Sequence, residues 1–67
     1  MKLYQIDSFT KAKFKGNPAG VCILEERLNK DQMQAIASEM NLSETAFIEK
    51  KGERYGLRWF TPASEVP

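Results

Sequence analysis

The chain has 67 residues, ten of them basic and nine acidic, and its formal net charge is +1. This balance leaves few cations to neutralise the phosphates of a nucleic acid. A single cysteine cannot form an internal disulfide, and the absence of histidine removes the commonest metal ligand. No segment has the pattern of a membrane span or a cleavable signal, so we expect a cytoplasmic polypeptide without a metal, a nucleic-acid partner or a membrane partner.

The amino-terminal residues divide into a predicted strand and a basic loop. Residues 2–9 alternate with apolar side chains on both sides, which predicts a strand covered on two faces. Lys11, Lys13 and Lys15 follow around Phe14. Because such runs are usually hydrated, we interpret this one as a solvated loop, with an anion-binding patch as the alternative.

A turn and a short apolar run come next. Gly16-Asn17-Pro18 has the chemistry of a turn, since glycine tolerates positive φ and asparagine can bond its own backbone. Residues 19–24 are continuously apolar and too few for a helix, which predicts a buried strand. Cys22 within it reads as a small core residue and not as a nucleophile, because no neighbouring cation would lower its pKa.

Clear start and stop signals bound the predicted helix. Asn29 can cap its amino terminus and Gln32 can complete a capping box, so the helix should begin near Lys30. Asn41 fits a left-handed stop. A sheet-facing apolar stripe at helical spacing contains Met33, Ile36, Ala37 and Met40.

Two further strands, residues 44–50 and 53–61, flank Lys51-Gly52, which we interpret as a two-residue hairpin turn. This register pairs Glu49 with Arg54 across the hairpin. It also covers a bare glycine with an aromatic ring, since Phe47 would face Gly56.

The same register places Glu44 directly opposite Trp59, on a face with Ala46, Ile48, Tyr55 and Leu57. Leaving water penalises a charged carboxylate, so an acid there should hold its proton more tightly and could act as a general acid or base. Two structural alternatives remain: the carboxylate could cap a backbone N–H, or a one-residue slip could turn it to solvent.

Four blocks of the chain, residues 6–10, 14–22, 33–47 and 57–66, together resemble the amino-terminal part of PhzF-like phenazine-biosynthesis proteins. The third block includes Asn41-Leu42-Ser43-Glu44-Thr45-Ala46-Phe47. The resemblance implies a diaminopimelate-epimerase-like fold, in which two domains, each a curved sheet around a central helix, enclose the active site. Members lack metal and organic cofactors, so we expect none here.

PhzF itself is an isomerase that moves a proton within a dihydro-hydroxyanthranilate. The resemblance implies that Glu44 is the general acid/base and that Ser43, Gly16 and Asn17 lie at the substrate. We therefore expect a PhzF-like isomerase or epimerase acting on a small carboxylated substrate. The alternative is a non-catalytic truncated fragment or an oligomerising interaction module.

The expected fold class is α+β, a curved and mostly antiparallel sheet with one packed helix. Residues 1–67 would form the amino-terminal part of the first PhzF-like domain, without the central helix that follows a Gly-His motif and without the second domain. We expect such a chain to be inactive alone. Its sheet face with Ile48, Leu57 and Trp59 would be uncovered, which predicts a homo-oligomer or assembly with a separately encoded remainder.

Overall fold

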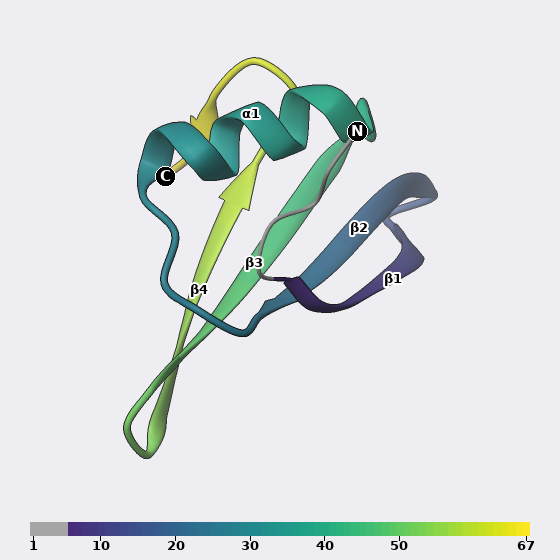
Figure 1. Ribbon diagram of the computed structural model, residues 1–67. Helices are drawn as coiled ribbons and strands as arrows, with labels where there is room; N and C mark the ends of the chain where they lie inside the picture. The colour runs from purple at the N-terminus through teal and green to yellow at the C-terminus, as the bar shows by residue number, and fades with distance from the viewer. Residues whose placement is uncertain (1–5) are drawn as a thin grey trace.

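The computed structural model describes residues 6–67, which form one sheet and one helix (Figure 1). The elements are β1 (Ile6–Phe14), β2 (Asn17–Leu24), α1 (Lys30–Met40), β3 (Glu44–Lys51), β4 (Arg54–Phe60) and β5 (Glu65–Val66). The strands lie in sequential order in the sheet; β2 and β3 are parallel and the other neighbours antiparallel. The predicted α+β class is confirmed.

The basic segment is strand and not loop, so that prediction was wrong. β1 pairs with β2 as far as Phe14 opposite Asn17. Lys15 (φ 53°) and Gly16 (φ 81°) are both left-handed and form a tight turn whose twist suits a hairpin, so strand pairing continues to the turn. β1 is an edge strand, where exposed lysines are common. Of the strand predicted over residues 2–9, residues 2–5 lie outside the described part of the chain.

The helix has the predicted boundaries. Asn29 Oδ1 accepts a hydrogen bond from the Gln32 backbone N–H at 2.8 Å, and Gln32 Oε1 accepts one from the Asn29 backbone N–H at 2.9 Å. Asn41 is left-handed (φ 53°) and its N–H donates to the carbonyl of Ala37. The capping box and the asparagine stop are thus confirmed.

The β3–β4 hairpin turns one residue later than predicted. Its turn is Gly52-Glu53, with Gly52 at φ 63°. Lys51 therefore pairs with Arg54, and the whole ladder is displaced by two residues. Glu49 faces Gly56 and not Arg54, while Phe47 faces Arg58 and not Gly56. Because side chains alternate with a period of two, this displacement leaves every residue on its predicted face.

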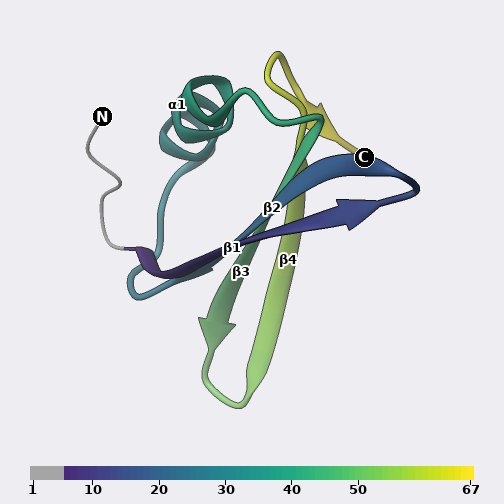
Figure 2. The ribbon, with the colours of Figure 1, turned by 90° about the vertical axis from the view of Figure 1, so that its right-hand side faces the viewer.

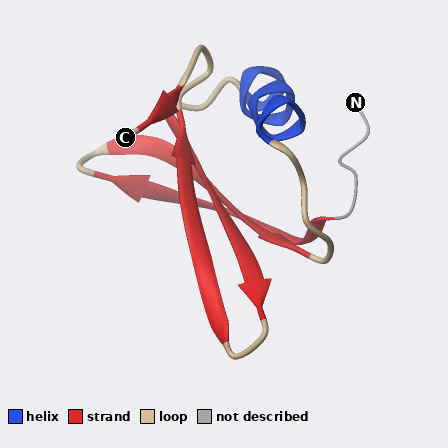
Figure 3. Cartoon of the chain, turned by 90° about the vertical axis from the view of Figure 1, so that its left-hand side faces the viewer, coloured by secondary structure: helices blue, strands red, loops and turns tan. Residues whose placement is uncertain are grey.

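Helix α1 covers one face of the twisted sheet (Figures 1 and 3). Phe47 of β3 and Phe60 of β4 meet edge to face on this side, with ring centroids 5.5 Å apart. Cys22 is fully buried here, as predicted, and burial raises the pKa of its thiol to about 11. The core comprises Cys22, Leu24, Leu28, Met33, Ile36, Ala37, Phe47 and Phe60.

The opposite face, which we call the open face, has no element across it within residues 6–67 (Figure 2). Phe14 packs against Trp59 there, with ring centroids 5.3 Å apart. Strand alternation and pairing give the described members of this face: Ser8, Thr10, Ala12, Phe14, Asn17, Ala19, Val21, Ile23, Glu44, Ala46, Ile48, Lys50, Tyr55, Leu57, Trp59 and Val66. Leu57 is exposed, while Ile48 and Trp59 are half-buried.

Candidate functional site

Glu44 is the first residue of β3 and belongs to the open face. It pairs with Ala19 of the parallel strand β2 and is half-buried. The sequence placed it directly opposite Trp59, but Trp59 pairs with Ala46, so the indole is a diagonal neighbour of Glu44. The observed register of the β3–β4 pairing differs from the predicted one by two residues. A difference of one residue would have turned Glu44 to the other face, and this did not occur.

The other predicted site residues lie near the same end of the sheet. Gly16 and Asn17 precede Ala19 on β2, and Ser43 precedes Glu44 on β3. Because β2 and β3 are parallel, these two strand starts are neighbours. One strand spacing and two residue rises separate the Cα atoms of Asn17 and Glu44 by about 8 Å. Gly16, Asn17 and Ser43 are exposed, which leaves their polar groups accessible to a ligand.

A tightly packed layer lies behind Glu44. Thr45 is fully buried, and its hydroxyl has no hydrogen-bond partner among the described residues. On the neighbouring strand, a Cβ at Gly20 would lie 2.8 Å from Phe9 Cε1 and 3.0 Å from Leu42 Cδ1. Thr45 and its partner Gly20 on β2 are both buried, so the start of the strand that carries Glu44 is closely packed on the helix side of the sheet.

The loop after β4 is a hydrogen-bonded polar feature near this end, and its hydrogen bonds were not predicted from the sequence. Thr61 Oγ1 accepts hydrogen bonds from the backbone N–H groups of Ala63 (3.3 Å) and Ser64 (3.0 Å), and donates to the Ser64 carbonyl at 3.1 Å. Helix α1 holds the same loop, because Gln34 Nε2 donates to the Thr61 carbonyl at 3.0 Å. Thr-Pro at positions 61–62 was the available signal for such a turn.

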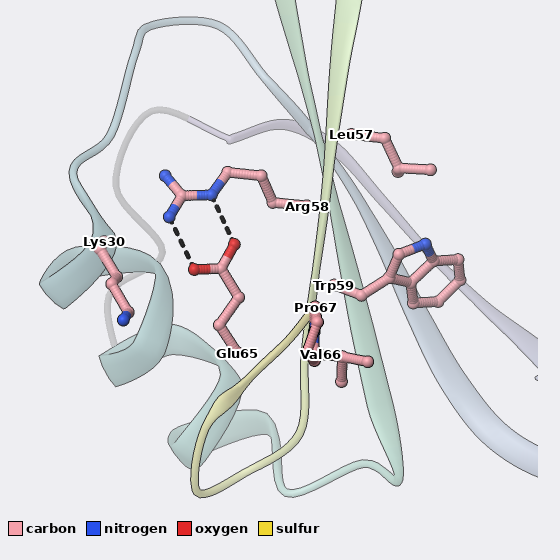
Figure 4. A pocket seen from close by; sticks show the side chains of 7 residues that line it. All are labelled: Lys30, Leu57, Arg58, Trp59, Glu65, Val66 and Pro67. Carbon is pink, nitrogen blue, oxygen red and sulfur yellow. Dashed lines mark hydrogen bonds and ion pairs between the residues drawn. The ribbon is translucent and has the colours of Figure 1, made fainter.

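An ion pair fixes β5 to β4 on the helix side of the sheet (Figure 4). Arg58 Nε and Nη2 donate to the two carboxylate oxygens of Glu65 at 2.7 and 2.8 Å. These hydrogen bonds hold the pKa of Glu65 below its ordinary value. This pair was not predicted from the sequence, because it depends on how β5 pairs with β4.

A groove of about 480 Å³ surrounds this ion pair and passes across the edge of β4. Figure 4 shows Arg58 and Glu65 on one side of the strand and Leu57 and Trp59 on the other. Its lining residues are Lys30, Leu57, Arg58, Trp59, Glu65, Val66 and Pro67. None of the four predicted site residues lines this groove, so it is a feature separate from the Glu44 end of the sheet.

Glu49 is a second carboxylate of β3, and sequence reasoning predicted its cross-strand partner wrongly. It lies on the helix face and is 5% exposed. It forms a long ion pair with Arg27, whose Nε lies 3.9 Å from Glu49 Oε2 and whose side chain is exposed. Glu44 and Glu49 therefore occupy opposite faces of β3, and only Glu44 can meet a ligand on the open face.

Residues 6–67 contain no group of three or more histidine, cysteine, aspartate or glutamate side chains placed to hold a metal ion. The single helix in the same range is too short and too polar to cross a membrane.

Comparison with known proteins identifies the family. The model of the PhzC-PhzF family, described as phenazine biosynthesis-like protein, matches residues 6–67. The chain belongs to this family. A phenazine biosynthesis-like domain-containing protein 1 of Mus musculus is 53% identical over 75 aligned residues, covering 100% of this chain and 26% of the mouse protein. An uncharacterized isomerase of Clostridium acetobutylicum is 62% identical over 68 residues, covering 97% and 22% of the two chains.

Solved structures agree with this assignment. A PhzF-family protein from Enterococcus faecalis matches with a TM-score of 0.69 and 56% identity over 91% of this chain and 24% of its own. A protein described as a putative PhzC/PhzF protein from Clostridium difficile has a TM-score of 0.72 at 49% identity, over 87% and 24% of the two chains. This PhzF-like chain spans about a quarter of the length of these relatives.

Proposed function

We propose that this chain provides the amino-terminal part of a PhzF-like isomerase, in which Glu44 takes a proton from one carbon of a small carboxylated substrate and returns it to another. The reaction would need no cofactor. The observation that carries the proposal is that Glu44 is the only carboxylate on the open face among the strand residues from 8 to 66. The isomerase names of two bacterial relatives support the reaction class.

The surroundings of Glu44 suit proton transfer. It is half-buried beside alanines and diagonal to Trp59, so a bound substrate would exclude water from the carboxylate. General acid–base catalysis needs such a positioned group and contributes about 10² to 10⁴ in rate. The close packing at Thr45 and Gly20 supports this role because it backs the start of the strand on the helix side.

Substrate binding is proposed for Ser43, Asn17 and Gly16. The Ser43 hydroxyl and the Asn17 amide can donate hydrogen bonds to a substrate carboxylate, and the left-handed turn at Gly16 exposes backbone N–H groups beside them. Further groups of a complete site would come from the part of the protein that the relatives have and this chain does not cover.

The test replaces the corresponding quarter of a complete family isomerase, active on dihydro-hydroxyanthranilate, with this chain and measures deuterium uptake from D₂O by NMR. Glu44→Gln should lower the rate by about 10² to 10⁴, because an amide cannot exchange the proton. The control is Glu39→Gln, the same chemical change at an exposed position of α1. Undiminished isomerisation by a folded Glu44→Gln chimera would reject the assignment.

A further inference from the structure

The lysines of the β1–β2 hairpin lie on different faces of the sheet. Lys11 and Lys13 alternate with open-face residues along β1, so both belong to the helix face. Lys15 follows β1 in the turn, and its left-handed backbone (φ 53°) breaks this alternation. Its Nζ lies 5.5 Å from the ring centroid of Phe14, which belongs to the open face. The ammonium of Lys15 is thus on the same face as Glu44.

The curvature of the sheet brings this ammonium toward Glu44. Phe14 of β1 reaches Trp59 of β4, with 5.3 Å between the ring centroids, so the β1–β2 hairpin bends over the open face. Lys15 and Trp59 therefore approach the same Phe14 ring. Since Trp59 is the diagonal neighbour of Glu44, the ammonium and the carboxylate lie at the same end of the face, a separation that a small carboxylated substrate can bridge.

Other basic side chains lie farther from Glu44 or already hold a carboxylate. Lys50 belongs to the open face, but six residue rises along β3 place it about 20 Å from Glu44. Arg58 lies on the helix face, where both carboxylate oxygens of Glu65 accept its hydrogen bonds. No carboxylate in the described part of the chain lies within ion-pair distance of Lys15, whose side chain is exposed. Lys15 can therefore offer its charge to a ligand at this end.

We propose that Lys15 binds the carboxylate of the substrate and so gives the site its preference for anionic substrates. The inference rests on the proposed function of Glu44. A carboxylate held by the Lys15 ammonium, the Asn17 amide and the N–H groups of the turn at Gly16 would direct the rest of the substrate along β2 toward Glu44. Charge-assisted hydrogen bonds are about twice as strong as neutral ones, so Lys15 contributes more to binding than the neutral groups beside it.

Steady-state kinetics of the chimeric isomerase, with dihydro-hydroxyanthranilate as substrate, test this role. Lys15→Gln should raise KM about fivefold and leave kcat within about twofold, because the ammonium binds ground state and transition state alike. Lys15→Arg keeps the charge, so its KM should stay within about twofold of the wild-type value. Lys13→Gln makes the same change on the helix face of β1 and is the matched control. A Lys15→Gln enzyme with the KM of Lys13→Gln would overturn the proposal.

Two ligands give a second readout that does not depend on turnover. Anthranilate has a carboxylate, and anthranilamide replaces it with a neutral amide of nearly the same shape. Isothermal titration calorimetry of the chimera gives the dissociation constant of each. Lys15→Gln should weaken anthranilate binding about fivefold and anthranilamide binding less than about twofold. Equal losses for both ligands would show that the substitution disturbs the turn, and the contact between Lys15 and the carboxylate would be rejected.

The two substitutions separate this proposal from the proposed function. Glu44→Gln should lower kcat, whereas Lys15→Gln should raise KM. If Glu44→Gln lowers kcat and Lys15→Gln changes neither KM nor anthranilate binding, the role of Lys15 is overturned and the proposed function stands. If anthranilate binding depends on Lys15 while the Glu44→Gln enzyme isomerises normally, the carboxylate site stands and the acid–base assignment fails.

Discussion

Thr45 and Thr61 have the same side chain, but their hydroxyl groups differ in hydrogen bonding. The same substitution should therefore change the free energy of unfolding in opposite directions at the two positions. The Thr45 hydroxyl is buried without a partner among the described residues. The Thr61 hydroxyl takes part in three hydrogen bonds that close the loop after β4. Valine matches threonine in shape and in branching at Cβ, so Thr→Val removes little besides the hydroxyl.

Burying an unpaired hydroxyl costs about 1–3 kcal/mol. Thr45→Val should therefore raise the free energy of unfolding by about 1–2 kcal/mol. Thr61→Val should lower it by a similar ~1–2 kcal/mol, since two backbone N–H groups lose their acceptor. For a domain of this size, 1 kcal/mol moves the melting temperature by about 4–8 °C.

Urea denaturation followed by circular dichroism gives the two free energies, and the melting temperatures provide an independent check. All samples should have the same protein concentration, because association would add its own stabilisation. A loss of stability in Thr45→Val would refute the reasoning, since it would mean that the hydroxyl is paired in the folded chain. An unchanged Thr61→Val would mean that the loop does not depend on its threonine.

Three further predictions concern other parts of the sheet. Gly20→Ala should destabilise the fold by about 1–3 kcal/mol in the same denaturation assay, because the new Cβ would lie 2.8 Å from a ring carbon of Phe9; a neutral result would show that the ring moves freely. Hydrogen bonds from Arg58 lower the pKa of Glu65, so the pair stabilises the fold above the ordinary carboxyl pKa and loses this effect as pH falls through the lowered value. Glu65→Gln should therefore flatten the stability profile on the acid side of the ordinary carboxyl pKa, and an unaltered profile would contradict this. The Cys22 thiol, buried and with its pKa raised to about 11, should resist Ellman's reagent at pH 8 until urea is added, so rapid modification of the native chain would count against the buried position.

The helix could be predicted almost to the residue because its ends depend on neighbouring side chains. Asn29, Gln32 and Asn41 act on backbone groups within one turn, so their effect is visible in the sequence. The β3–β4 register could not be read as reliably. A glycine fits either position of a two-residue turn, and the choice of Gly52-Glu53 over Lys51-Gly52 moved every cross-strand partner by two residues.

The candidate site could likewise be predicted only in part, because some of its geometry depends on contacts between strands that are distant in the sequence. Alternation along β3 was enough to place Glu44 on the open face. Its closeness to Asn17 depends on the parallel pairing of β2 with β3, which no local pattern reveals. The burial of Glu49 and the pairing of Arg58 with Glu65 likewise come from contacts between strands, and sequence reasoning missed both.

The sequential order of the strands has a consequence for how the protein is made. Each strand from β2 onward pairs with one that precedes it in the chain, so its template is already present when it leaves the ribosome. The β1–β2 and β3–β4 hairpins close over short loops, whereas the ladder between Ala19 and Glu44 must wait until the helix has been synthesised. Synthesis and folding can therefore proceed in the same direction, with the joining of the two hairpins as the slow step.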